Sequence, residues 1–319
     1  MVARLVLSSE IIEVKNPPVL LYGQPGVSKT SLGQTAKNPL TLDFDKGIHR
    51  SAFRKASLYF ETWDEVVQVQ QNGVVDNGTI VMAKNFGSYD TIVVDTIGTM
   101  LTAMTQAIIA NNSKMGTKTG GLTMQGWGAL GTLFENWLTG LRQMGKQVIM
   151  IAHQKEEKEG DGRVMRPDIS GRSYAIVMNC ADVVGYVSYR NGVRSISWEP
   201  TDDYFAKNGA RLISGPIPDF NAVPDYMDRL LTQAKANLGS TAESSAKLAG
   251  EVEKWEARLE PGDCDVTKIN EVLTDFKKMT GASQTLKTQV WSLMKNTADK
   301  LNLTFNKEAA RFEEKASAA

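Results

Sequence analysis

The most constraining feature of this sequence is a glycine-containing loop near the amino terminus that ends in a lysine and a threonine. It reads Gly23-Gln24-Pro25-Gly26-Val27-Ser28-Lys29-Thr30. The loop approximates the pattern G-x-x-x-x-G-K-[ST], in which backbone N–H groups form an anion site, the lysine reaches the terminal phosphates and the hydroxyl binds Mg²⁺. We therefore predict that these eight residues bind the phosphates of ATP and that Thr30 is a ligand of Mg²⁺.

The loop departs from the pattern at Ser28, where a glycine is expected, and Gly26 supplies a glycine two residues earlier. Serine fits this turn if its φ stays negative or if backbone strain is tolerated. A plain Gly/Pro turn followed by a helix is the alternative interpretation, and the strand expected upstream and the helix expected downstream favour the phosphate loop.

Short apolar runs alternate with longer amphipathic segments from Pro18 to about Trp198. This alternation is typical of an α/β fold with a mainly parallel central sheet covered by helices. The expected strands are Val19–Tyr22, Leu40–Asp43, Thr91–Asp95 and Gln147–Ala152, and the expected helices are 29–37, 97–110 and 127–144. Strands at 183–189 and 193–198 are expected to form a terminal hairpin, so that the sheet is mixed at one edge.

The strand pattern stops after Gly215-Pro216-Ile217-Pro218, and the rest of the chain is helical in character. Apolar stripes run through 266–279 and 286–301 at helical spacing. We expect a core at residues 1–222 and a helical C-terminal region at 223–319. The segment Gly239–Ser245, rich in glycine and serine, predicts a flexible joint.

Charge and cysteine content exclude several classes of protein. Lys and Arg total 36, as do Asp and Glu, so any DNA-binding surface is local. The two cysteines, Cys180 and Cys264, lack zinc-site spacing and predict no disulfide framework. No run approaches the ~20 apolar residues of a membrane span, so we expect a cytoplasmic protein without membrane association.

Three polar positions follow the expected strands. Asp95 ends an apolar strand and is the candidate ligand of Mg²⁺ through water, opposite Thr30, with Thr96 assisting. Asp43 and Asp45 lie at i, i+2 and share a face at the carboxyl end of the sheet. Asp45 is the candidate general base or water-orienting residue; the alternative is that Asp43 or Asp45 caps the helix that follows.

His153 ends the apolar run Val148–Ala152. We interpret it as a sensor that contacts the γ-phosphate or the attacking water and relays its presence to the following segment. A capping or solvated histidine is the alternative.

The order of these parts resembles the RecA-like P-loop ATPases, in particular short AAA-family ATP-binding proteins of phages that assist single-strand annealing recombination. The resemblance covers about residues 15–215 and rests on the phosphate loop, on Leu42–Asp45, on Ile92–Thr96 and on Val148–His153, with 126–130 and 181–186 in support. It implies a RecA-like core, ATP and Mg²⁺ as cofactors, a ring or filament of identical subunits, single-stranded DNA as a partner and the host cytoplasm as the location.

The resemblance also implies further functional residues. Lys207 and Arg211 match a pair that acts across the subunit interface on the neighbour's γ-phosphate, although the arginine comes later than usual; both could be ordinary solvated charges. Two loops are expected to meet DNA, namely Asn111–Gly121 with Lys114 and Lys118, and 154–172 with Arg163, Arg166 and Arg172. Mobile surface connections are the alternative for both loops.

Three functions compete. The first is an ATP-hydrolysing, oligomeric factor of DNA recombination or single-strand annealing, with DNA-stimulated turnover. The second is a nucleotide-dependent switch or adaptor with slow turnover that works through its helical tail, suggested by Ser28 and by the short side chain of Asp45. The third is a helicase or helicase-loader ATPase.

The helical tail is nearly neutral, with 12 Lys and Arg against 13 Asp and Glu from Ser240 onward. This balance argues against an electrostatic DNA clamp. The tail is either a packed bundle that stabilises the core or the oligomer, or a surface for a protein partner such as a single-strand-binding protein.

Overall fold

A computed structural model describes residues 5–76, 79–160, 162–260 and 264–315. The chain divides into two compact units. The core unit comprises Val14–Leu238, and the terminal unit comprises Gly239–Ala319 together with Met1–Glu13.

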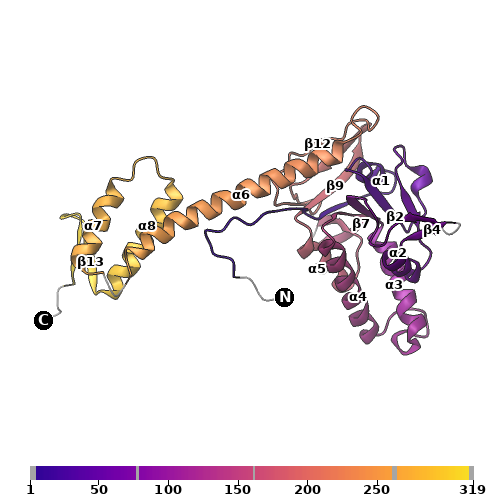
Figure 1. The fold of residues 1–319 in the computed structure, drawn as a ribbon, viewed down its shortest axis with the longest axis horizontal. Helices are drawn as coiled ribbons and strands as arrows, with labels where there is room; N and C mark the ends of the chain where they lie inside the picture. The colour runs from indigo at the N-terminus through magenta and orange to yellow at the C-terminus, as the bar shows by residue number, and fades with distance from the viewer. Residues whose placement is uncertain (1–4, 77–78, 161, 261–263, 316–319) are drawn as a thin grey trace. The chain divides into compact units, whose positions relative to one another are not determined.

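The core unit is built on one large sheet (Figure 1). Its strand order is β12-β10-β9-β1-β7-β6-β2-β3. All neighbours from β9 to β3 are parallel, and β10 is antiparallel to β9. The expected mixed sheet is therefore confirmed. The strands of the sheet are β1 (Val19–Gly23), β2 (Pro39–Asp43), β3 (Ser57–Tyr59), β6 (Thr91–Asp95), β7 (Gln147–Glu159), β8 (Gly162–Pro167), β9 (Val183–Arg190), β10 (Val193–Ser197), β11 (Lys207–Asn208) and β12 (Gly215–Pro216).

Helices cover both faces of this sheet because alternate residues of its buried strands point to opposite sides. Leu20 and Tyr22 belong to one apolar core, with residues of α2, α3, α4 and α5, while Val19 and Leu21 belong to a second core, with α1 and the beginning of α6. The helices are α1 (Lys29–Gly33), α2 (Trp63–Asn72), α3 (Ile97–Asn111), α4 (Met124–Gln143), α5 (Gly171–Cys180) and α6 (Tyr226–Ala257), with the 3₁₀ helices η1 (Ile48–Arg50) and η2 (Ser113–Met115). A small hairpin of β4 (Val74–Asp76) and β5 (Thr79–Met82) lies outside the main sheet.

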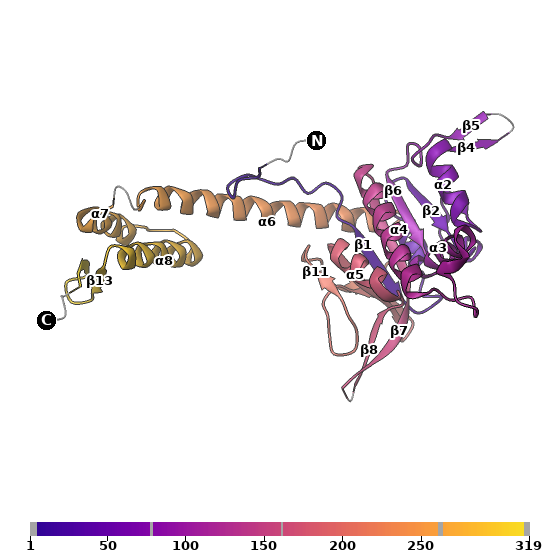
Figure 2. The same cartoon turned by 90° about the horizontal axis from the view of Figure 1, so that it is seen from below.

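Two expected elements of the core differ from the structure. The helix predicted at 29–37 ends at Gly33, because Thr35 and Ala36 form i→i−3 backbone bonds that tighten the chain before β2. The loop predicted at 154–172 is instead a hairpin of β7 and β8 followed by α5, and the hairpin projects from the core unit (Figure 2). Oppositely charged side chains on its two strands form ion pairs that stabilise it.

The terminal unit consists of the rest of α6, α7 (Val266–Lys277), α8 (Gln284–Lys300) and a hairpin of β13 (Leu303–Asn306) and β14 (Arg311–Glu314). The predicted apolar stripes are confirmed as its core, where Ile269, Val272 and Val290 are fully buried. The closing hairpin was not expected. Its Phe305 contacts the Trp291 ring edge to face at 5.1 Å, so β-branched and aromatic residues complete the helical core.

The segment 239–245, predicted as a flexible joint, is helical and lies inside α6, while the division between the two units falls at its first residue. A single glycine costs a helix about 1 kcal/mol, and the surrounding Ala, Leu, Lys and Glu residues favour helix. The hydroxyl of Ser244 donates to the carbonyl of Ser240 at 2.8 Å, which satisfies its side chain within the helix. The two units therefore divide between Leu238 and Gly239, within α6, and not at residue 222.

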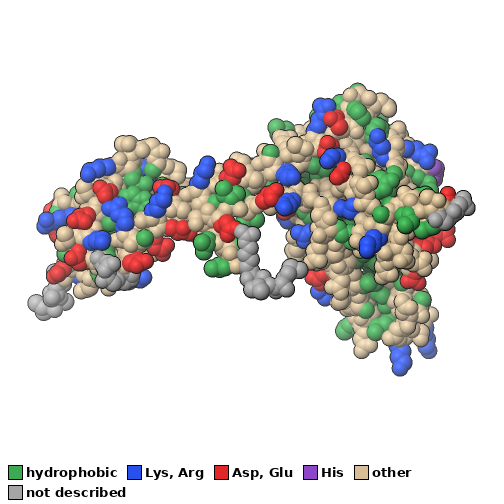
Figure 3. Space-filling view, in the orientation of Figure 1, with side chains coloured by type: hydrophobic (Ala, Val, Ile, Leu, Met, Phe, Trp, Pro, Cys, Tyr) green, Lys and Arg blue, Asp and Glu red, His purple; other side chains and the backbone are tan. Residues whose placement is uncertain are grey.

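Charges of both signs are interspersed over the terminal unit (Figure 3). None of the helices in the described ranges combines the length and apolarity needed to cross a membrane.

Candidate active site

The polar residues singled out in the sequence meet at the carboxyl edge of the sheet. Gly23 at the end of β1 is in register with His153 on β7, and Asp95 at the end of β6 is in register with Asp43 on β2. Because parallel strands point the same way, their carboxyl ends share one edge, where open α/β sheets bind ligands. The phosphate loop, Asp95, Asp45 and His153 thus come together as expected.

The backbone of the loop explains its glycines and its unusual serine. A Cβ atom on Gly23 would lie 2.1 Å from the carbonyl oxygen of Val187, so only glycine fits there. Gly26 has φ +82°, a conformation that glycine adopts freely. Ser28 has φ 69°, which costs a non-glycine residue ~1–2 kcal/mol. Of the two possibilities for Ser28, the structure has the strained one.

Lys29 is buried and folds back over the loop. Its side chain is 6% exposed, and its Nζ donates to the carbonyl oxygens of Gly23 at 2.9 Å and Gln24 at 2.8 Å. Burial lowers the pKa of this amine to about 8, although Asp95 and Asp45 oppose the shift. The amine is therefore mostly charged at neutral pH and held by two neutral acceptors that a phosphate can replace.

Thr30 and Asp95 form the pair expected of a Mg²⁺ site. The Thr30 hydroxyl donates to Oδ2 of Asp95. Burial raises the pKa of Asp95 to about 6, and its hydrogen bond from Thr30 works against this shift. A hydroxyl and a carboxylate are the hard oxygen ligands that suit Mg²⁺, which takes few protein ligands when it is bound with a nucleotide. The two side chains fit the ion.

Asp45 is held by three side chains above this pair. Its Oδ1 accepts hydrogen bonds from the Thr99 hydroxyl and, at 3.2 Å, from the Thr96 hydroxyl, and its Oδ2 lies 3.2 Å from Nε2 of His153. Burial is the strongest single effect on its pKa and acts upward, but the hydrogen bonds from His153 and the threonines outweigh it and lower the pKa. Asp45 is therefore an ionised carboxylate at neutral pH.

The two carboxylates at the end of β2, Asp43 in the strand and Asp45 after it, make separate contacts. Asp43 accepts hydrogen bonds from the backbone N–H of Gly47 at 3.1 Å and of Ile48 at 2.9 Å. It therefore supports the start of η1 from outside the helix, although the N-cap position that the alternative assigned to Asp43 or Asp45 is occupied by Gly47. Asp45 faces His153, and the capping interpretation does not apply to it.

His153 shows a polar atom that the chain does not satisfy. Within the described residues its Nδ1 is buried and has no hydrogen-bond partner. Its Nε2 faces Asp45, and its carbonyl accepts from the backbone N–H of Asp168 at 2.7 Å. His153 thus joins the site to the β7–β8 hairpin, since β7 continues through it.

A cavity of about 750 Å³, here called the phosphate cavity, contains these residues. Its walls include Lys29, Thr30, Asp45, Asp95 and His153. Two arginines that the sequence analysis missed, Arg50 from η1 and Arg194 from β10, also line it. No local motif marks Arg194, because it reaches the loop only through the strand order β10-β9-β1. Thr99 was also missed, although it lies one turn from Thr96 at the start of α3.

Lys207 and Arg211 lie outside the phosphate cavity of their own chain. Lys207 is in register with Val184 near the beginning of β9, and its Nζ donates to the carbonyls of Ala181 at 2.6 Å and Met178 at 3.2 Å. Arg211 is exposed, with φ 52°. An action of these two residues on a neighbouring subunit stays a prediction.

The candidate DNA-facing cations fall into two groups. Lys114 and Lys118 are exposed on the connection between α3 and α4, which an isolated bridge between Gly116 and Leu122 closes. Lys and Arg side chains are visible at the tip of this region in Figure 3. Neither lysine has an ion pair among the described residues.

The three arginines of the second group are paired with glutamates. Arg163 contacts Glu156 at 3.1 Å, Arg166 contacts Glu157 and Glu159, and Arg172 contacts Glu135 at 2.5 Å. Their positive charge is therefore already balanced within the chain, and their binding to DNA stays a prediction.

Sequence comparison places the chain among known proteins. Residues 15–210, more than half of the chain, match the family described as AAA domain. The chain is also similar to the SPbeta prophage-derived uncharacterized protein YorG of Bacillus subtilis strain 168, with 26% identity over 211 residues. This match covers 64% of the chain and 62% of the relative, which is less than two thirds of the relative's length.

Similar solved structures include a KaiC-like protein from Pyrococcus horikoshii OT3 and the flagellar accessory protein FlaH from Methanocaldococcus jannaschii. Each is 13% identical in sequence. The match to the KaiC-like protein has a TM-score of 0.30 and covers 58% of this chain and 78% of the KaiC-like chain. The match to FlaH has a TM-score of 0.28 and covers 56% of this chain and 75% of the FlaH chain.

Proposed function

Because this chain belongs to the AAA domain family of P-loop ATPases, we propose that it binds ATP with Mg²⁺ in the phosphate cavity and hydrolyses it. The observation that carries this proposal is the meeting of three features in one cavity: the buried amine of Lys29, the Thr30–Asp95 pair and the Asp45–His153 pair.

Each residue has a step in the proposed reaction. Lys29 exchanges the carbonyls of Gly23 and Gln24 for oxygens of the β- and γ-phosphates, while loop N–H groups bind the same anion. When bound, Mg²⁺ neutralises charge on these phosphates. The ionised carboxylate of Asp45 orients a water molecule and accepts its proton as the water oxygen attacks the γ-phosphorus. The bond between the γ-phosphorus and the β,γ-bridging oxygen breaks in the same step, and ADP leaves with the negative charge on its β-phosphate. Thr99 and His153 fix the direction of that carboxylate.

The direct test is steady-state ATP turnover with and without single-stranded DNA, with ATP binding measured separately. Turnover by the wild-type protein supports hydrolysis. ATP that binds but is not turned over, with or without DNA, would contradict hydrolysis and favour a nucleotide-dependent switch.

We propose that the hydrolysis serves DNA recombination or single-strand annealing, in an oligomer that acts on single-stranded DNA in the host cytoplasm. Two observations support this function. The relative YorG is prophage-derived. Lys114 and Lys118, which form no ion pair with any residue that the structure describes, place positive charge on a polar, glycine-rich loop suited to a phosphate backbone.

Charge reversal of this loop tests the DNA proposal. The double variant Lys114→Glu, Lys118→Glu is expected to weaken binding of an oligothymidylate about tenfold or more. Binding should also depend less steeply on salt concentration, because fewer counterions are released from the DNA when fewer phosphates are contacted. Fluorescence anisotropy at several salt concentrations measures both effects.

Lys84→Glu combined with Lys300→Glu is the control, because it makes the same charge change on exposed lysines elsewhere. Equal loss in the two double variants would mean that only overall charge matters. It would remove the loop from the proposed DNA site.

A nucleotide-dependent switch with slow turnover is the second candidate function. Ser28 favours it, because its left-handed backbone is strained where a glycine would be relaxed. The shorter Asp45, where the resembled family usually has glutamate, favours it as well. In this function the terminal unit would be the working surface.

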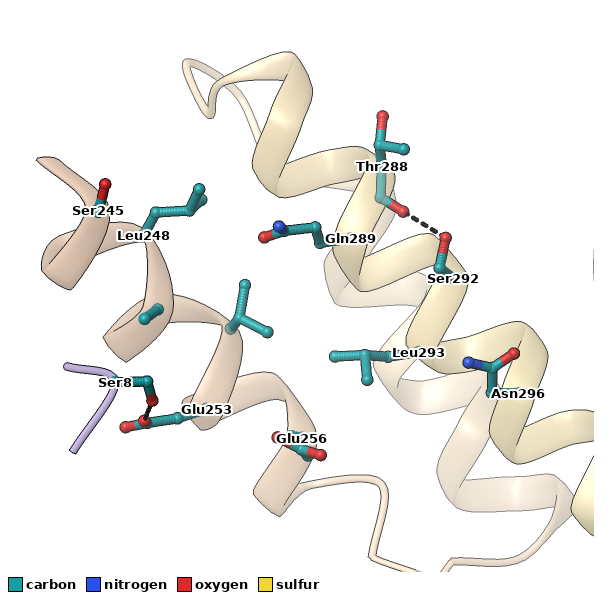
Figure 4. A pocket seen from close by; sticks show the side chains of 12 residues that line it. Ser8, Ser245, Leu248, Glu253, Glu256, Thr288, Gln289, Ser292, Leu293 and Asn296 are labelled. Atoms are coloured by element: carbon teal, nitrogen blue, oxygen red, sulfur yellow. Dashed lines mark hydrogen bonds between the residues drawn. The ribbon is translucent and has the colours of Figure 1, made fainter. Parts of the chain in front are cut away.

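The terminal unit contains a groove between two of its helices (Figure 4). Its volume is about 530 Å³, and α6 and α8 form its two sides. Leu248 and Leu293 point into it, and Glu253 and Glu256 add negative charge on the α6 side. We propose that it binds an amphipathic segment with apolar and basic side chains, supplied by a single-strand-binding protein or another recombination factor.

A bulky side chain in the groove tests this partner. Ser292 is exposed on α8 and lines the groove, so Ser292→Trp is expected to weaken binding of the purified host single-strand-binding protein about tenfold, as blocked anchor pockets do. Thr285→Trp, on the exposed part of the same helix, is the control. Undiminished binding by Ser292→Trp, measured by surface plasmon resonance, would exclude the groove for that protein.

A further inference from the structure

A second cavity of about 270 Å³ adjoins the phosphate cavity. The two share Ser28, Ala52 and Arg194 in their walls. None of Lys29, Thr30, Asp45, Asp95 and His153 lines the second cavity. It therefore opens from the side of the phosphate loop away from the proposed reaction, and we call it the side cavity.

The walls of the side cavity are fixed by the central sheet. One wall is the turn and strand start at Gly192–Arg194, and the other is the segment 217–221. The strands β10 and β12 pair beside them, and the backbone N–H of Ile217 donates to the carbonyl of Arg194 at 2.8 Å. Backbone pairing of this kind sets the distance between the walls before any ligand binds.

The walls of the side cavity combine apolar and polar side chains, which suits a flat group with apolar faces and polar edges. Val193, Ile217, Pro218 and Phe220 supply apolar surface. Phe220 is itself buried against Phe53, with ring centroids 6.4 Å apart, which keeps its position fixed. Asp219 and Asn221 add polar atoms at the edge. The walls therefore combine apolar side chains with polar and charged groups in about equal measure, as a site for a ring with hydrogen-bonding edges requires.

Arg194 stands where the two cavities meet. Its guanidinium lies over the ring of Tyr189 at 5.2 Å, and it has no carboxylate partner in the described part of the chain. An unpaired guanidinium beside a phosphate loop is available to bind phosphate oxygens. The phosphate nearest to the side cavity is the one that carries the nucleoside, since the γ-phosphate end is fixed by Asp45 and His153.

We propose that the nucleoside of ATP binds in the side cavity and that Arg194 binds the α-phosphate at its entrance. This inference rests on the proposed function of the phosphate cavity and orients the nucleotide within it. The triphosphate then runs from His153 past Lys29 to Arg194, and the base lies between Val193 and Ile217.

Comparing ATP with inorganic tripolyphosphate tests the side cavity by itself. Val193 is 51% exposed on β10, so Val193→Trp fills the cavity and keeps a residue that favours strands. By calorimetric titration we expect ATP affinity to fall at least about tenfold and tripolyphosphate affinity to be unchanged, as a bulky group blocks only the nucleoside. Val81→Trp, at a 60% exposed valine on β5, is the control.

A second variant tests Arg194. Arg194→Ala is expected to weaken ATP and tripolyphosphate alike, about tenfold, because it removes a charge-assisted contact to phosphate. Arg54→Ala, an exposed arginine outside both cavities, is expected to have no effect.

Different results would contradict the nucleoside site in the side cavity and the phosphate site in the phosphate cavity. Unchanged ATP affinity in Val193→Trp, or an equal loss for both ligands in that variant, would overturn the side cavity as the nucleoside site. Binding that persists in Lys29→Ala would instead overturn the phosphate cavity itself.

Discussion

Replacing Lys29 with alanine is expected to weaken ATP binding at least about 100-fold and to reduce turnover to background, because charge-assisted hydrogen bonds are worth ~1.5–3 kcal/mol each and the lysine makes them to two phosphates. The amine is the positive charge buried deepest in the phosphate cavity. No neighbouring cation can take its position, since Arg50 and Arg194 are exposed on the cavity walls.

Titration of the variant with ATP in the presence of Mg²⁺ measures the loss. Lys37→Ala is the matched control, because Lys37 follows the same short helix and its side chain is 69% exposed. We expect the control to bind ATP as the wild type does. If Lys29→Ala binds ATP within a few-fold of the wild type, the loop is not a phosphate site and every role derived from it is lost.

The sequence predicted the parts of this site that depend on local pattern and on sheet topology. Buried strands read as continuous apolar runs, so β1, β2 and β6 were predicted within one residue of their bounds. Once the strands are parallel, their last residues must share an edge. This is why Asp45, Asp95 and His153 could be placed together without knowing the register.

Choosing between Asp43 and Asp45 needed the structure. Both carboxylates follow one strand, and the two-residue spacing gives them the same face. Only the turn into η1 brings the backbone N–H groups of Gly47 and Ile48 onto Asp43, which leaves Asp45 to His153. The distinction depends on the backbone path of this short turn and on the contact of Asp45 with the distant His153, and neither has a sequence signature.

The residues missed by the sequence analysis belong to contacts between distant segments. Arg194 comes near the phosphate loop because β9 lies between β10 and β1. The hairpin forms by backbone pairing of β7 with β8, and ion pairs lie across its strands. The helix through 239–245 was missed because of its local composition, not because of a contact with a distant segment. Local composition suggested a linker, while one glycine among helix formers was not enough to break α6.

Asp45→Asn is expected to lower ATP turnover at least about 100-fold, in the range typical for loss of a general base, with ATP affinity within about threefold of the wild type. Asparagine keeps the shape and can still accept from Thr99. It carries no charge, however, and cannot take a proton from water. Asp45 is also not expected to touch the phosphates that Lys29 and the loop bind, so binding and turnover should separate.

Asp43→Asn is the informative contrast, because Asp43 ends the same strand but only supports η1. Its amide oxygen can accept one of the two backbone hydrogen bonds, while its NH2 group faces the other N–H. We therefore expect a loss of stability, with turnover of the folded protein within about fivefold of the wild type. Steady-state assays of both variants, with binding measured in parallel, compare the two carboxylates directly.

Full turnover in Asp45→Asn would leave ATP binding intact and remove only the base assignment. A larger loss of turnover in Asp43→Asn than in Asp45→Asn would assign the general base to Asp43. The contact of Asp45 with His153 would then serve only to hold β7 at the edge of the site.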